Sequence, residues 1–87
     1  MAYAVMLDPA AERQLGRIDK ASRLRILKKL VSLEKENQAR HLEKGLPFFV
    51  AEAGQFRICF KVQENGKEKR VYFIGNHKEY EKWYSGK

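Results

Sequence analysis

Apolar and polar residues alternate from Gln55 to Val62, and this period of two is typical of a strand with one buried face. The pair Asn65-Gly66 follows, and it favours a hairpin in which both turn positions have a positive φ. The run from Val71 to Gly75 then predicts the partner strand.

The register of this hairpin follows from the turn. With two turn residues at the tip, Phe60 faces Val71 and Ile58 faces Phe73. The apolar faces of both strands then coincide, which a shift by one residue would not allow.

The opposite face of the hairpin is mixed. It carries Arg57, Cys59, Lys61, Arg70, Tyr72 and Ile74. Lys61 falls opposite Arg70, and like charges directly opposite each other destabilise a sheet. Such a face is either an ordinary solvated surface or a surface that binds a polyanion, and the hairpin alone leaves both open.

The segment before the hairpin predicts a strand and two helices. Residues 2–7 are short and apolar, which favours a covered strand. Asp8 is a good N-cap for a helix that ends near Gly16, and Asp19 caps a second helix that runs to about Asn37.

Apolar residues recur at helical spacing in the second helix and predict the face that packs on the sheet. They are Leu24, Leu27, Leu30, Val31 and Leu33, with Ile26 on the flank. The other side of this helix is basic.

The remaining segments complete the expected fold. Residues 38–47 predict a loop, and 48–53 a third apolar strand that a tight turn at Ala53-Gly54 joins to the hairpin. Asn76 caps a short helical turn over 78–84. We therefore expect one α+β domain over residues 1–87, with element order β-α-α-β-β-β and a short C-terminal helical turn. Its mainly antiparallel, twisted sheet has two helices packed on one face.

Composition narrows the class of partner. The net charge of +7 favours nucleic acid, the ribosome or an acidic protein. The single cysteine excludes an internal disulfide framework. No signal peptide and no stretch of transmembrane length is visible, which predicts a cytoplasmic protein with no membrane association.

The basic surface, Arg57, the two histidines and the aromatic residues of the tail are residue types that suit metal-free phosphodiester chemistry. Phosphate loops, metal-type Cys/His spacings and serine elbows are missing, so we expect neither a metal nor a cofactor. Histidine moves protons near neutral pH, arginine binds phosphate with two parallel bonds, and aromatic rings stack on unpaired bases.

The whole chain resembles the RelE/ParE superfamily of bacterial and archaeal toxins. The resemblance lies in the order of elements, in the passage HLEKGLPFFVAEAGQFRICF and in the ending VYFIGNHKEYEKWY. Within it, GNHKEY resembles the Gly-x-His-x-acidic ending of the YafQ-like and HigB-like branches. The chain departs from RelE itself, which carries lysines where this sequence has Val50 and Glu52.

The resemblance implies a ribosome-dependent mRNA endonuclease that cleaves by 2′-hydroxyl attack. It also implies an acidic antitoxin that forms a hetero-oligomer with the toxin. The catalytic residues that it implies are His77, Arg57 and His41, with Tyr84 one step from the position of the final tyrosine of RelE. Attack by a 2′-hydroxyl also needs a base, and Glu52 is a candidate for it beside His41. The residues expected to bind RNA are Lys61, Arg70, Tyr72, Lys44, Lys78 and Trp83.

Two other functions remain open at this point. One is a ParE-like inhibitor of DNA gyrase, which acts by binding without catalysis. The other is a non-catalytic module of the same fold that binds RNA or the ribosome. Purely structural roles also remain open for single residues, such as a surface ion pair between Arg57 and Glu52.

Overall fold

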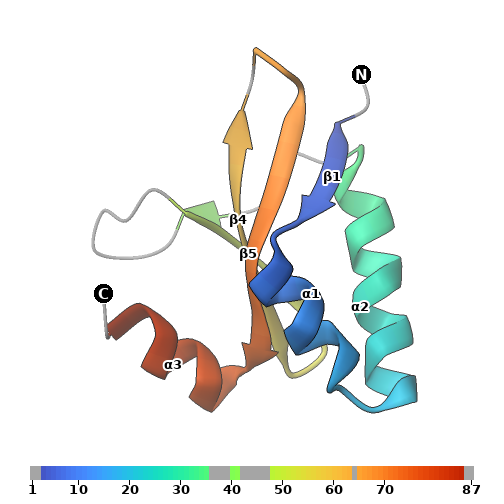
Figure 1. Cartoon of the computed structure of the whole chain (residues 1–87), viewed down its shortest axis with the longest axis vertical. Helices are drawn as coiled ribbons and strands as arrows, with labels where there is room; N and C mark the ends of the chain where they lie inside the picture. Colours follow the sequence, from blue (N-terminus) through green and yellow to red (C-terminus); the bar gives the residue numbers. More distant parts are fainter. Residues whose placement is uncertain (1–2, 36–39, 42–47, 64, 86–87) are drawn as a thin grey trace.

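The computed structural model describes residues 3–35, 40–41, 48–63 and 65–85, with the backbone alone at positions 40, 41 and 84. The elements are β1 (Ala4–Leu7), α1 (Pro9–Gly16), α2 (Lys20–Leu33), β2 (Arg40–His41), β3 (Phe49–Ala53), β4 (Phe56–Gln63), β5 (Glu68–Asn76) and α3 (His77–Ser85). Helices α1 and α2 lie on one side of the sheet, and α3 lies apart from them at the end of β5 (Figure 1). The predicted α+β class is confirmed.

The strands form one sheet in the order β1-β5-β4-β3-β2. The pairs β2–β3, β3–β4 and β4–β5 are antiparallel, whereas β1 pairs with β5 in parallel. The expectation of a mainly antiparallel sheet is therefore confirmed. The prediction of an unbroken loop over 38–47 was wrong at positions 40 and 41, because these two residues pair with the start of β3.

The β4–β5 hairpin keeps the predicted register only near its tip. Phe60 faces Val71 and Lys61 faces Arg70, as predicted. A β-bulge then inserts Tyr72, so that Cys59 faces Phe73. The predicted pairing of Ile58 with Phe73 was wrong, because one extra residue on β5 shifts all later partners by one.

After the bulge, the side chains of β5 lie on the opposite side of the sheet from the one predicted. Ile58 now faces Ile74, and both side chains are buried in the core beneath α1 and α2. Phe73 instead stacks against Trp83 of α3, with ring centroids 5.0 Å apart. The sequence had placed Ile74 on the outer face and Phe73 in the core, and the bulge corrects both.

Both tight turns differ from the prediction by about one residue. In the β4–β5 turn the positive φ belongs to Lys67, at 51°, and Gly66 is not in the left-handed region. In the β3–β4 turn Ala53 pairs with Phe56, so the turn residues are Gly54, with φ 63°, and Gln55. A left-handed φ favours glycine, which explains the choice of residue at position 54.

The two N-caps of the first helices are confirmed. The Asp8 side chain accepts a hydrogen bond from the Ala10 amide, and the Asp19 side chain accepts one from the Ser22 amide. Helix α1 ends at Gly16 as expected, but α2 ends at Leu33, earlier than predicted.

The face of α2 that packs on the sheet also differs from the prediction. The buried residues are Ile26, Leu30 and Leu33, which are spaced by four and three. Leu24, Leu27 and Val31, predicted to be core residues, are exposed. Helix α2 therefore carries more apolar residues than the core uses.

Helix α3 is nine residues long, not the short turn that the tail predicted. Its start is stabilised by a capping box: the Glu79 amide donates to Asn76 Oδ1, and the Asn76 amide donates to Glu79 Oε1. Gly75 lies just before it, and a Cβ there would lie 2.6 Å from Phe73 Cζ. The residue at position 75 must therefore be small for α3 to pack so close to the end of β5.

A buried lysine connects the sheet to the end of α2. Lys69 is 1% exposed, and its Nζ donates a 2.7 Å hydrogen bond to the carbonyl of Leu33. The same Nζ lies 4.5 Å from the centre of the Tyr3 ring. This ammonium group satisfies a carbonyl that the end of the helix leaves without an intrahelical partner.

Candidate functional site

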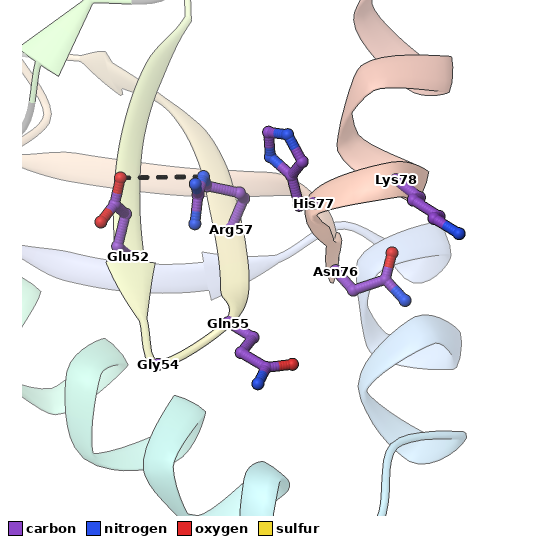
Figure 2. A pocket seen from close by; sticks show the side chains of 7 residues that line it. All are labelled: Glu52, Gly54, Gln55, Arg57, Asn76, His77 and Lys78. Carbon is purple, nitrogen blue, oxygen red and sulfur yellow. Dashed lines mark ion pairs between the residues drawn. The ribbon is translucent and has the colours of Figure 1, made fainter.

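A cleft of about 610 Å³ opens where β3, β4 and β5 meet the start of α3. Its lining consists of Glu52, Gly54, Gln55, Arg57, Asn76, His77 and Lys78. Figure 2 shows Glu52, Arg57 and His77 side by side, whereas Lys78 points away from them. Three of the five predicted catalytic residues therefore lie in one cleft.

Local structure explains how these three side chains meet. Glu52 and Arg57 are direct cross-strand partners on β3 and β4, on the face opposite the core. His77 is the first residue of α3, directly after the end of β5. The capping box at Asn76 and Glu79 fixes where the helix starts, and so where the histidine lies.

Arg57 has two neighbours within the site. Its Nε lies 3.7 Å from Glu52 Oε2, and its guanidinium carbon lies 6.0 Å from the centre of the Tyr80 ring. The ion pair is partly solvated, with 22% and 49% of the two side chains exposed, so it contributes at most about 1 kcal/mol. A phosphate group of a ligand can therefore displace Glu52 from Arg57 at little cost.

His77 has a partner that sequence reasoning missed. Its Nε2 lies 3.2 Å from Oε2 of Glu81, four residues later on the same helix. A carboxylate at one ring nitrogen orients the imidazole and leaves Nδ1 as the nitrogen that can meet a ligand. The signal was available as an i, i+4 spacing, but it counts only once the tail is known to be helical.

A second, smaller cavity of about 240 Å³ lies at the other end of the hairpin. Three of the predicted RNA-binding residues line it: Lys61, Arg70 and Tyr72. Although the two cations are direct cross-strand partners, Lys61 Nζ lies 5.5 Å from the Tyr72 ring centre, and Arg70 Nε lies 3.4 Å from Glu68 Oε2. These contacts offset the repulsion expected between like charges.

Aromatic rings occupy the same face beside this cavity. Phe48 packs edge-on against Tyr72 and against Trp83, at centroid distances of 5.8 and 5.0 Å, and Lys61 Nζ lies 5.1 Å from its ring centre. Trp83 is half-buried by this packing and by the stack on Phe73. The predicted RNA-binding tryptophan is thus also a structural contact of α3.

The remaining predicted residues are placed only in part. The backbone of His41 pairs with Phe49 in β2, and Tyr84 belongs to α3, but both side chains lie outside the described part of the chain. Lys44 also lies outside it. Their predicted roles stay predictions.

The single cysteine, Cys59, lies on β4 two residues after Arg57. Cys59 is fully buried, and burial raises the pKa of its thiol to about 12, although the nearby Arg57 acts to lower it. Such a thiol stays protonated at neutral pH, so Cys59 is a packing residue.

Two kinds of feature are absent from the described residues. Within 3–35, 40–41, 48–63 and 65–85, no group of three or more His, Cys, Asp or Glu is arranged to hold a metal ion. None of the helices in those ranges is long and apolar enough to cross a membrane.

Comparison with known proteins identifies the fold. No family model matches the chain, and no curated protein matches it. Solved structures do match. The toxin–antitoxin complex RelBE2 from Mycobacterium tuberculosis aligns with TM-score 0.81 and 15% identity over 88% of this chain and 93% of that one.

Two further structures are similar. A mutant of the E. coli toxin RelE in the free state aligns with TM-score 0.78 and 18% identity over 95% of this chain and 92% of that one. The archaeal RelE–RelB complex from Pyrococcus horikoshii aligns with TM-score 0.70 and 20% identity, over 87% of this chain and 96% of that one. The chain therefore has the fold of RelE toxins.

Proposed function

We propose that this protein, which has the RelE fold, is the toxin of a type II toxin–antitoxin pair and cleaves messenger RNA on the ribosome. The observation that supports it most is the meeting of His77, Arg57 and Glu52 in one cleft. A base, an acid and a cation are the groups that metal-free cleavage of a phosphodiester requires.

The proposed reaction begins with the ribose 2′-hydroxyl. Glu52 takes the hydroxyl proton as the 2′-oxygen forms a bond to the adjacent phosphorus, with His41 as the alternative base. Arg57, which stays protonated, stabilises the charge that grows on the phosphate oxygens. His77 donates a proton to the 5′-oxygen as the bond from phosphorus to that oxygen breaks, leaving a 2′,3′-cyclic phosphate and a free 5′-hydroxyl.

The rest of the same face binds the RNA strand in this proposal. Lys61 and Arg70 lie beside the aromatic residues Tyr72 and Phe48, and such a mixture suits phosphates and unpaired bases. The net charge of +7 favours the polyanionic ribosome and also an acidic antitoxin, with which the protein forms a hetero-oligomer in the cytoplasm.

Replacement of His77 by alanine tests the mechanism. Single-turnover cleavage of mRNA on programmed ribosomes should slow by about 10²- to 10⁴-fold, the usual contribution of a positioned proton-transfer group. Ribosome binding should stay near wild type, because one side chain adds little to an interface of a protein with a net charge of +7. Lys82→Ala is the matched control, since Lys82 is exposed on the same helix and does not line the cleft.

Three results would contradict this assignment. Cleavage by His77→Ala within about threefold of wild type removes His77 from the mechanism, because a proton-transfer group is worth far more. Loss of binding together with cleavage makes it a structural residue. Inhibition of DNA gyrase by a wild-type protein that leaves mRNA intact favours the ParE-like alternative.

A further inference from the structure

Two uncharged amide side chains line the cleft, and the proposed reaction gives them no role. Gln55 lies in the turn between β3 and β4, and Asn76 is the last residue of β5. Both residues are exposed, and both line the cleft that contains Arg57 and His77. Figure 2 shows Gln55 and Asn76 below Arg57 and His77 in this view, each on a different element. We call these two residues the amide pair.

The capping box at the start of α3 fixes the orientation of the Asn76 side chain. Its Oδ1 accepts a 2.9 Å hydrogen bond from the Glu79 amide, so the oxygen is engaged by the helix. The amino group at Nδ2 is the half of the amide that the cap does not use, and it can only donate. An asparagine that capped nothing could rotate and present either half. Asn76 therefore offers a ligand a donor whose direction is fixed.

Gln55 supplies the complementary group. Phe56 is the direct cross-strand partner of Asn76, so Gln55 lies one residue further along the same end of the sheet. Opposite residues on paired strands lie about 5 Å apart, which brings both amides within reach of one flat ligand. No capping bond restricts Gln55, and its amide presents an acceptor at Oε1 or a donor at Nε2. The amide pair can therefore offer one donor and one acceptor side by side.

We propose that the amide pair reads the edge of a nucleobase next to the scissile phosphate and selects guanine or uracil. The inference rests on the proposed function in that it takes the ligand of the cleft to be RNA. The exocyclic oxygen of the base accepts a hydrogen bond from Asn76 Nδ2. The neighbouring ring N–H, N1–H in guanine and N3–H in uracil, donates to Gln55 Oε1. Asparagine and glutamine side chains are established readers of base edges.

Adenine and cytosine fit the same donor poorly. Both bases carry an amino group where guanine and uracil carry the oxygen. That amino group and Asn76 Nδ2 are both donors, and a donor left without an acceptor costs more than a hydrogen bond gains. Asparagine usually binds adenine with both halves of its amide, but the cap already occupies Asn76 Oδ1. The capping box therefore supplies the selectivity as well as the start of the helix.

Charge separates the amide pair from the phosphate-binding part of the cleft. Contacts to phosphate position a nucleic acid, whereas contacts to base edges specify its sequence. Arg57 is a cation and suits the phosphate, whereas Gln55 and Asn76 neutralise no charge. Changes in the amide pair should therefore alter the preference among bases and leave the salt dependence of RNA binding unchanged.

Variants that keep the cap test the role of the Asn76 amino group. Serine and aspartate cap helices as well as asparagine does, so Asn76→Ser and Asn76→Asp should retain α3 and lose the donor. The substrates are messages that differ in one base beside the scissile bond, cleaved by the wild-type protein on programmed ribosomes in single-turnover reactions. Guanine or uracil at one of the two flanking nucleotides should give cleavage at least about fivefold faster than adenine or cytosine.

The ratio of these rates is the measurement, because a general loss of activity cancels in it. The ratio should fall to about one in Asn76→Ser and in Gln55→Met. In Asn76→Asp an acceptor replaces the donor, so the ratio should fall below one. Lys82→Gln is the matched control, since Lys82 is exposed on α3 and does not line the cleft, and it should keep the wild-type ratio.

Two results would overturn the proposal. One is a wild-type protein with no preference, or with a preference for adenine or cytosine. The other is a preference that Asn76→Ser and Gln55→Met both retain, with α3 intact by circular dichroism. That result would make Asn76 a helix cap and nothing more.

Binding of free RNA separates this inference from the proposed function. The probes are fluorescent single-stranded RNAs of about six nucleotides that differ in one central base, and anisotropy gives their affinities for the protein alone. If the wild-type protein does not cleave RNA, the proposed function fails. Tighter binding of the guanine and uracil probes, lost in Asn76→Ser, then still supports the base reading, and equal affinities overturn it. If cleavage is intact and no variant changes the ratio of rates, only the base reading is wrong.

Discussion

The two faces of the sheet are covered very differently. On one face α1 and α2 bury a continuous core that includes Ile58, Phe60, Val71 and Ile74. On the other face one nine-residue helix, α3, is attached through the stack of Trp83 on Phe73 and the capping box at Asn76. The first face therefore supplies most of the stability, whereas the second face carries the cleft.

The largest expected effect tests whether the face covered by α1 and α2 contributes more stability than the face covered by α3. Phe60→Ala removes a ring that is 1% exposed in the core, and such truncations lower the free energy of unfolding by about 3–5 kcal/mol. Trp83→Ala removes a larger ring system, but one that is only half-buried, and should cost clearly less. Urea unfolding monitored by circular dichroism measures both variants. Equal losses would mean that α3 is as much a part of the core as α1 and α2.

A smaller effect is expected at the junction between β5 and α3. In Gly75→Ala the new Cβ would lie 2.6 Å from Phe73 Cζ and 2.9 Å from Glu79 Oε1, so the Phe73 ring and the Glu79 side chain, which belongs to the capping box, must shift. Overpacking of this kind costs about 1–3 kcal/mol. Hydrogen exchange should show faster exchange in α3 with β4 and β5 still protected. Gly66→Ala is the control, because a Cβ there meets nothing within 4 Å.

The capping box should matter less than the packing. Asn76→Ala removes the acceptor of the Glu79 amide, and loss of an N-cap costs about 1 kcal/mol. The melting temperature should fall slightly, and mRNA cleavage should fall with it because His77 is the next residue. Asn65→Ala, in the exposed hairpin turn, should change neither. Cleavage unchanged in Asn76→Ala would show that the helix start is held by other contacts.

The smallest effect compares cations on the two faces. Replacing Lys61 and Arg70 by glutamine should reduce the slope of log affinity for RNA against log salt by about 1 for each phosphate that is no longer neutralised. Replacing Lys20 and Lys28 by glutamine removes the same charge from the exposed surface of α2, which lies on the other side of the sheet from the cleft. The salt slope for RNA should then stay unchanged. Equal changes in both pairs would indicate that net charge alone, and not the site face, determines RNA binding.

The features that the sequence predicted correctly depend on local rules. Asp8 and Asp19 cap helices because a short acceptor side chain precedes each helical run. The pairing of Phe60 with Val71 followed from alternation and the nearby turn. His77 and Arg57, which the resemblance implied as catalytic residues, both line the cleft, although the predicted register did not bring them together.

The features that the sequence did not predict depend on tertiary packing. Phe73 and Ile74 are consecutive apolar residues, so either of them could face the core. The sequence pattern therefore does not reveal the bulge at Tyr72, which decides that Ile74 does. Helix α2 has two apolar rows, and only docking decides that Ile26 faces the sheet while Leu27 faces solvent. For α3 the cap at Asn76 was predicted correctly, but Glu79, three residues later, was not recognised as the second half of a capping box.

The parallel pairing of β1 with β5 has a consequence for the order of events during translation. Ala4 pairs with Glu68 and Leu7 with Val71, so the first strand finds its partner only after nearly the whole sheet has been synthesised. At about 5–20 residues per second, the intervening chain takes several seconds to appear. Until then β1 has no strand to pair with, and Lys69 is not present to bind the end of α2. The cleft itself includes Asn76, His77 and Lys78, so it cannot form before the end of β5 and the start of α3 have been synthesised. Under the proposed function, a nascent chain that has not yet reached α3 cannot cleave messenger RNA.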